Sequence, residues 1–292
     1  MSLHKPTVFT GAATALITPF LGGAVDYGAL GNLIDAQIES GINALLVAGT
    51  TGEGSTLTLE ECVAITRFAK DRIGGRVPLL AGCGSNSTAH AIELVCALSE
   101  AGADALLAVT PYYNKTNDAG ILAHYRALAD AATRPLILYN VPARTGFSMK
   151  LDHYRALAAH ENIVGVKEAS GDAELLASLC EECGDTLDIY TGNDHQTALS
   201  IKLGAQGVIS VISNIMPREI VELCRLALAG DHRLAAERQR ALLGRTQALF
   251  REVNPIPVKY VAALRGLCAA EYRLPLCPPS AEVSRMLQKL FC

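Results

Sequence analysis

The sequence predicts one (β/α)8 barrel, in the α/β class, with a C-terminal helical extension. Half of the 292 residues are hydrophobic, which is enough for one large core. Eight short apolar runs alternate with amphipathic stretches along the chain. The runs are apolar almost throughout, as is typical of parallel strands that are buried on both faces.

The eight runs are the predicted strands of the barrel. They cover residues 13–20, 44–51, 77–84, 103–111, 134–142, 162–170, 186–194 and 205–213. The stretches between them have helical periodicity, and several end in a glycine close to the next strand, where a helix stops. Eight such units without a break in strand order favour a closed barrel over an open doubly wound sheet, which is the alternative.

The strand pattern ends near residue 216, and the remainder has the pattern of three or more helices. We therefore expect two regions. Residues 1–215 form the barrel that carries the active site, and residues 216–292 form the C-terminal helical extension.

Composition argues against several classes of protein. The net charge is −4 and the basic residues are scattered, so we expect neither nucleic acid nor a membrane as partner. The start of the chain lacks the apolar core of an export signal, and nine cysteines are spread along it, which predicts reduced thiols in the cytoplasm. Cys180 and Cys183 have no second ligand pair, so we expect no metal there.

Polar residues end the predicted strands and should converge, because active sites of such barrels lie at the carboxyl ends of the strands. Lys167 is the one lysine of eight that lies within a predicted strand. Burial disfavours its ammonium form and provides a free amine able to attack a ketone. The alternative is a structural lysine in an ion pair with Glu168 or Glu53.

An imine-forming lysine needs groups that move protons. Tyr113 and Tyr139 each end a strand, and Thr50 or Thr51 ends another, so a threonine hydroxyl bridging two phenols provides a relay. The seven histidines show no metal-ligand spacing, which argues against a metal-dependent aldolase. We expect no cofactor beyond a covalent Schiff base.

Four motifs at the ends of predicted strands together match a known family: Gly49-Thr-Thr-Gly-Glu53, Val109-Thr-Pro-Tyr-Tyr-Asn114, Tyr139-Asn-Val-Pro-Ala-Arg-Thr-Gly146 and Gly165-Val-Lys-Glu-Ala169. With them the chain resembles the dihydrodipicolinate synthase family of pyruvate-dependent class I aldolases, which are related to N-acetylneuraminate lyase. The resemblance covers nearly the whole chain, from Thr14 to Lys259.

The resemblance implies a role for each matching residue. Lys167 would form the Schiff base with pyruvate, and Tyr139, Thr50 and Tyr113 would relay protons. Tyr113 would act in the neighbouring subunit of a homo-oligomer, a dimer of dimers. The residues that would bind substrate are Thr51, Arg144, Gly192 and Ile209.

Arg144 favours L-aspartate semialdehyde as the second substrate, because a guanidinium matches a carboxylate with two parallel hydrogen bonds. The expected reaction joins pyruvate to this aldehyde for lysine and diaminopimelate biosynthesis. Two alternatives stay open. One is another pyruvate aldolase, acting on 2-keto-3-deoxy sugar acids or hydroxy-oxoglutarate, and the other is a barrel that binds keto acids without catalysis.

Lysine-inhibited members of the family carry a second, allosteric site at the dimer interface. The chain keeps Asn86 and Tyr112 of that site, but Leu59, Cys62 and His90 replace the His, His and Glu of sensitive enzymes. The loss of an acidic partner for the ligand's ammonium groups predicts weak or absent inhibition by lysine.

Overall fold

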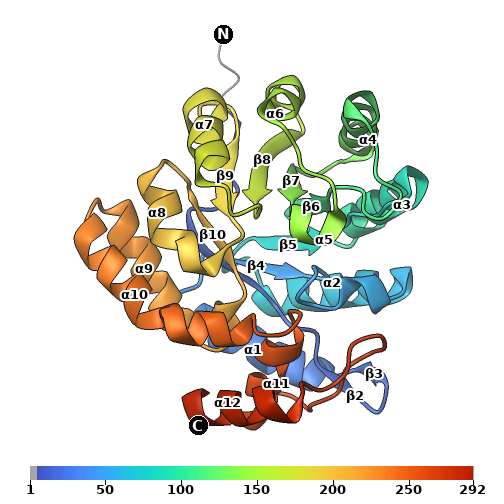
Figure 1. Cartoon of the computed structure of the whole chain (residues 1–292). Coiled ribbons are helices and arrows are strands. Elements are labelled where there is room, and N and C mark those ends of the chain that lie inside the picture. Colours follow the sequence, from blue (N-terminus) through green and yellow to red (C-terminus); the bar gives the residue numbers. More distant parts are fainter. Residues whose placement is uncertain (1–4, 292) are drawn as a thin grey trace.

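The computed structural model describes residues 5–291 and shows a closed barrel of eight parallel strands surrounded by helices (Figure 1). Around the barrel the order is β1, β10, β9, β8, β7, β6, β5 and β4, and β4 pairs again with β1. The strands are β1 (Gly11–Ala15), β4 (Ala44–Val47), β5 (Leu79–Gly82), β6 (Ala105–Val109), β7 (Leu136–Asn140), β8 (Ile163–Glu168), β9 (Asp188–Thr191) and β10 (Gly207–Ser210). All eight predicted strands are present, and the predicted fold is confirmed.

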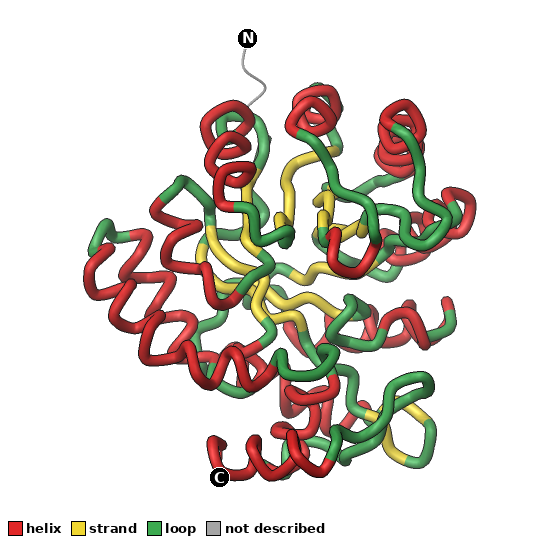
Figure 2. Tube along the Cα trace, viewed as in Figure 1, coloured by secondary structure: helices red, strands yellow, loops and turns green. Residues whose placement is uncertain are grey.

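A ring of helices covers the outside of the barrel, as the tube in Figure 2 shows. Its members are α1 (Tyr27–Glu39), α2 (Leu59–Ile73), α3 (Thr88–Glu100), α4 (Asp118–Ala131), α6 (Leu151–Ala158), α7 (Ala173–Cys183), α8 (Thr197–Lys202) and α9 (Pro217–Leu228). A short helix, α5 (Pro142–Thr145), follows β7 directly. Three more helices end the chain: α10 (His232–Leu249), α11 (Ile256–Leu264) and α12 (Ala281–Phe291).

The barrel closes where β1 lies beside β10, and glycines permit the closure. Gly11 pairs with Gly207. A Cβ on Gly207 would lie 1.8 Å from the Gly11 carbonyl oxygen, a distance that no side chain can occupy. Gly11 itself has a φ of +108°, which favours glycine.

Alternation along the strands divides the core into two layers. In β7, Leu136 and Leu138 face the helices, whereas Ile137 and Tyr139 face the barrel interior. The Phe9 and Tyr190 rings stack inside this inner layer with centroids 4.2 Å apart. Packed side chains fill the barrel, and Tyr139 is the inward residue nearest the carboxyl end of β7.

The structure differs from the expectation at the strand ends. The predicted runs extend past the carboxyl ends of the observed strands, and buried residues such as Ile17 and Ile212 continue the apolar pattern of some runs into the loops. The run 13–20 ends in a small hairpin of β2 (Phe20–Leu21) and β3 (Ala24–Val25) that was not predicted.

The predicted boundary at residue 215 stays a prediction, with one detail added by the packing. α9 begins at Pro217 and packs against β1 and β10, in the place of the eighth barrel helix. We therefore propose to count the extension from α10. Among the described residues, no helix is both long and apolar enough to cross a membrane.

Candidate active site

A cavity of about 260 Å³ opens at the carboxyl ends of the strands. Five of the residues predicted for catalysis or substrate binding line it, and they come from one loop, two strands and the short helix α5: Thr50, Thr51, Tyr139, Arg144 and Lys167. The fold thus brings together residues that are more than a hundred positions apart in the chain.

Lys167 is the fifth residue of β8 and points into the barrel beside Tyr139. Only 6% of its surface is exposed, and its Nζ lies 4.4 Å from the centroid of the Tyr139 ring. Burial lowers the pKa of Lys167 to about 8, an effect that the nearby Arg144 charge increases and the buried Asp194 carboxylate opposes. The amine is therefore uncharged in about a tenth of the molecules at pH 7, far more than for a lysine with its ordinary pKa.

The ion pairs considered for Lys167 are not formed. Glu53 pairs with Lys259 instead, and the Glu168 carboxylate accepts hydrogen bonds from Asn140 and Tyr154 behind the strand. Among the described residues, Lys167 takes part in no salt bridge. The aliphatic part of the Lys167 side chain is packed, whereas its amine has no carboxylate partner in a salt bridge among the described residues.

Glycine at position 192 makes room for that stem. A Cβ there would lie 2.9 Å from Cε of Lys167 and 2.6 Å from Cβ of Ala169. Ile209 is fully buried in the inner layer of the barrel. Neither Gly192 nor Ile209 lines the cavity in the described chain, so their predicted contacts with substrate stay predictions.

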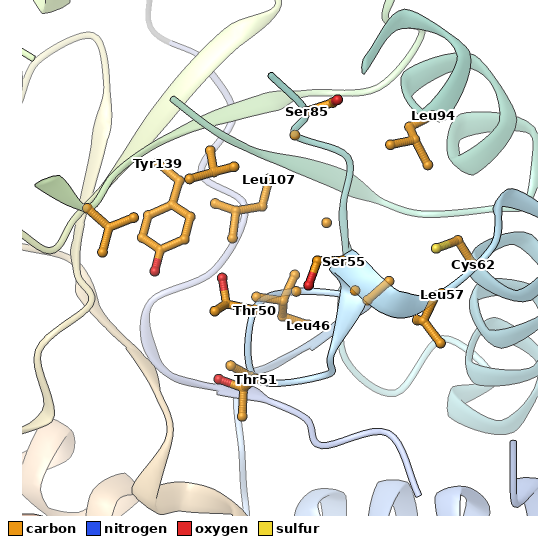
Figure 3. A pocket seen from close by; sticks show the side chains of 18 of the residues that line it. Leu46, Thr50, Thr51, Ser55, Leu57, Cys62, Ser85, Leu94, Leu107 and Tyr139 are labelled. Carbon is orange, nitrogen blue, oxygen red and sulfur yellow. The ribbon is translucent and has the colours of Figure 1, made fainter. Parts of the chain in front are cut away.

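Tyr139 and Thr50 form one half of the predicted relay. Figure 3 shows their hydroxyl groups turned toward each other, with Thr51 beside Thr50. Burial raises the pKa of Tyr139, while the Arg144 charge and a hydrogen bond with Thr50 act in the opposite direction. The phenol therefore stays protonated at neutral pH and is held where it can exchange a proton with Thr50.

Tyr113 lies apart from this group. It is 91% exposed, has a left-handed backbone with φ 68°, and does not line the cavity, whereas its neighbour Tyr112 does. Within one chain the relay therefore ends at Thr50. The predicted role of Tyr113 in a neighbouring subunit stays a prediction.

Asn254 is a residue of the site to which the sequence analysis assigned no role. Its side-chain Nδ2 donates a hydrogen bond to Thr51 Oγ1 at 3.0 Å, and its carbonyl accepts one from Arg144 Nη2 at 2.9 Å. Its Oδ1 is buried and has no hydrogen-bond partner in the described part of the chain. In the sequence, only the resemblance of residues 254–259 to the family pointed to Asn254. Its contact with Thr51 could not be predicted locally, because the two residues are 203 positions apart.

The same cavity is also lined by four of the five residues predicted for an allosteric region: Leu59, Cys62, His90 and Tyr112. Leu57 and Leu94 join them, and Figure 3 places Leu57, Cys62 and Leu94 across the cavity from Tyr139. Asn86 does not line it, and its carbonyl accepts a hydrogen bond from Asn114. Weak inhibition by lysine stays a prediction.

Other donor sets are sparse. Over residues 5–291, no three His, Cys, Asp or Glu side chains are grouped as a metal site would require. Cys180 and Cys183 are free thiols at the end of α7, and burial raises the pKa of both.

Comparison with known proteins gives one consistent result. The model of the Dihydrodipicolinate synthetase family matches residues 8–291. The 4-hydroxy-tetrahydrodipicolinate synthase of Pelobacter propionicus is 46% identical over 271 residues, 93% of each chain. A crystal structure of dihydrodipicolinate synthase from Aquifex aeolicus has a TM-score of 0.94 at 42% identity and 97% coverage of both chains. The chloride-inhibited enzyme from Acinetobacter baumannii, complexed with pyruvate, has a TM-score of 0.95 at 40% identity, again with 97% coverage.

The pKa of Lys167 predicts how its reactivity depends on pH. A pKa near 8 gives about a tenth of the amine in the free form at pH 7 and about nine tenths at pH 9. The rate of imine formation with a small ketone should rise about tenfold between these values and then level off. Stopped-flow or reductive trapping across this range measures it. A rise of about a hundredfold without a plateau would show an ordinary lysine instead.

Proposed function

Because the chain belongs to the dihydrodipicolinate synthetase family, we propose that it condenses pyruvate with L-aspartate 4-semialdehyde to give 4-hydroxy-tetrahydrodipicolinate. The enzyme is a lyase of the class I aldolase type, in lysine and diaminopimelate biosynthesis. One observation carries the assignment. A buried lysine with a lowered pKa shares its cavity with Tyr139, Thr50 and Arg144.

The first half-reaction activates pyruvate on Lys167. The free amine adds to the ketone carbon of pyruvate, and the carbinolamine loses water to form an imine. Tyr139, in its relay with Thr50, supplies the proton that the leaving hydroxyl needs. The Tyr139 phenolate then accepts a methyl proton from the imine, which gives the enamine, and the phenol later donates this proton to the aldehyde oxygen. Thr51 and the backbone of its turn hold the keto-acid carboxylate.

The second half-reaction forms the carbon–carbon bond. The enamine carbon attacks the aldehyde of the semialdehyde, whose carboxylate Arg144 holds. The α-amine of the bound product attacks the imine carbon, closes the ring and expels the Lys167 amine. The balance is pyruvate plus semialdehyde in, and cyclic product plus one water out.

Arg144 supports this substrate over a sugar-derived aldehyde, and the site as a whole supports catalysis over binding alone. A sugar-derived aldehyde presents no carboxylate at that position, and a barrel that only binds keto acids has no need of a lowered lysine pKa or a tyrosine–threonine pair. We further propose that the enzyme works in the cytoplasm without a cofactor, as a dimer of dimers.

The imine should be found on Lys167 and nowhere else. Borohydride reduction in the presence of pyruvate should add one reduced pyruvate to the peptide that contains Lys167, as peptide mass spectrometry would show. Lys167→Ala should abolish both the label and turnover, whereas Lys202→Ala, at the end of α8, should keep both. Label on another lysine, or turnover by Lys167→Ala, contradicts the mechanism.

Loss of the Arg144 guanidinium should weaken use of the semialdehyde. We expect Arg144→Ala to lower kcat/KM for the semialdehyde. The charged bidentate contact that is lost should contribute about 2–5 kcal/mol to stabilisation of the transition state. Pyruvate trapping should survive when it is measured near pH 9, where Lys167 is mostly uncharged. Arg134→Ala, an exposed arginine just before β7, is the matched control. An unchanged kcat/KM in Arg144→Ala would mean that the aldehyde is recognised elsewhere.

Tyr113 should act across a subunit interface. A mixture of inactive Tyr113→Phe and Lys167→Ala proteins, after subunit exchange, should regain roughly a quarter of wild-type activity, since half of the dimers contain one intact site. A mixture of Lys167→Ala with Tyr139→Phe is the control. These two residues lie 4.4 Å apart in one chain and cannot complement each other. Equal recovery in both mixtures, or none in either, contradicts action in trans.

A further inference from the structure

The turn that carries Thr50 and Thr51 has an unusual backbone. Ala48 and Glu53 both have left-handed conformations, with φ of 51° and 55°. The turn is closed by a hydrogen bond from the Gly54 amide to the Gly49 carbonyl at 3.0 Å. A Cβ on Gly54 would lie 2.1 Å from the Ala48 carbonyl oxygen, so the backbone passes very close to itself. A non-glycine residue such as Glu53 adopts this conformation only where its surroundings impose it.

Lys259 of the C-terminal extension pairs with Glu53 at the end of this turn. Its Nζ lies 2.5 Å from Glu53 Oε1, and both side chains are fully buried. Glu53 Oε2 accepts a second hydrogen bond from the Arg273 amide at 3.2 Å. The Lys259 ammonium also sits 4.1 Å from the centroid of the Phe20 ring. The Glu53 carboxylate is thus held from two directions by residues more than 200 positions away.

Stability is a poor explanation for this pair. Removing two charges from water costs much of what their attraction returns, and apolar pairs of similar volume often stabilise a protein as well or better. A buried ion pair does fix the relative position of its two side chains, because the charged groups must meet in one geometry. Here that geometry sets the end of the turn whose other residues, Thr50 and Thr51, line the cavity (Figure 3).

We propose that Lys259 is a positioning residue for the condensation: through Glu53 it aligns Thr50 with Tyr139 and Thr51 with the keto-acid carboxylate. The inference rests on the proposed function. It gives the C-terminal extension a part in catalysis, because α11 supplies Lys259. Asn254, which precedes α11, donates a hydrogen bond to Thr51.

The test separates alignment from stability with a neutral pair. Lys259→Met and Glu53→Gln each leave one buried charge without its partner, so each should lower Tm. The double variant removes both charges at similar volume and should recover most of that loss. The control for loss of a lysine ion pair remote from the cavity is Lys70→Met. It breaks the partly exposed ion pair between Lys70 on α2 and Asp104.

Alignment predicts that the double variant regains Tm but not activity. Its kcat should stay about tenfold to a hundredfold below wild type, with a raised KM for pyruvate, because small displacements of catalytic groups carry such penalties. Borohydride trapping of pyruvate on Lys167 should persist. A double variant with wild-type kcat and KM overturns the proposal, and so does one that does not fold, since the pair would then serve folding itself.

The same experiment distinguishes failure of the proposed condensation from failure of the role of Lys259. If wild-type protein forms no imine on Lys167, the proposed function fails irrespective of Lys259. If wild-type and Lys70→Met proteins trap pyruvate and turn over equally, and the folded double variant does too, only the role of Lys259 fails.

Discussion

Removal of the Lys167 amine from water is the constraint on which the rest of the site depends. An amine at its ordinary pKa would be almost wholly protonated at neutral pH and unable to attack a ketone. The barrel lowers that pKa by placing the lysine on an inward strand position above a packed interior, where burial disfavours the charge. Asp194 tempers the effect, so the amine titrates within reach of physiological pH rather than far below it.

The surroundings of β7 and β8 hold this amine against its partner. Tyr139 pairs in register with Lys167 on the inner face, and Asn140 pairs with Glu168 on the outer face. Behind the strands, the Glu168 carboxylate accepts hydrogen bonds from Asn140 at 3.0 Å and from Tyr154 at 2.8 Å. Side chains proposed to act in catalysis and structural ones alternate along the same two strands. Each outward polar contact therefore constrains the inward geometry.

The C-terminal extension is part of the site as well as of the fold. Asn254 connects the turn of Thr51 with Arg144, so the groups proposed to bind the two substrate carboxylates share one support. Lys259 and the backbone of Arg273 hold Glu53 at the end of the same turn. The barrel loops alone would leave this left-handed turn without these contacts.

Local sequence patterns determined most of the fold, because the burial of each strand and the alternation of strands and helices are visible in the order of apolar and polar residues. They sufficed for all eight strands, for the inward position of Lys167 and, with the family motifs, for Thr50, Tyr139 and Arg144. They did not reveal that Lys259, an ordinary lysine in a helical stretch, is fully buried and pairs with Glu53, or that Asn254 joins Thr51 to Arg144. Tertiary structure decided these contacts. A buried polar or charged side chain needs a partner, and the partners of Lys259 and Asn254 lie about 200 residues away in the chain.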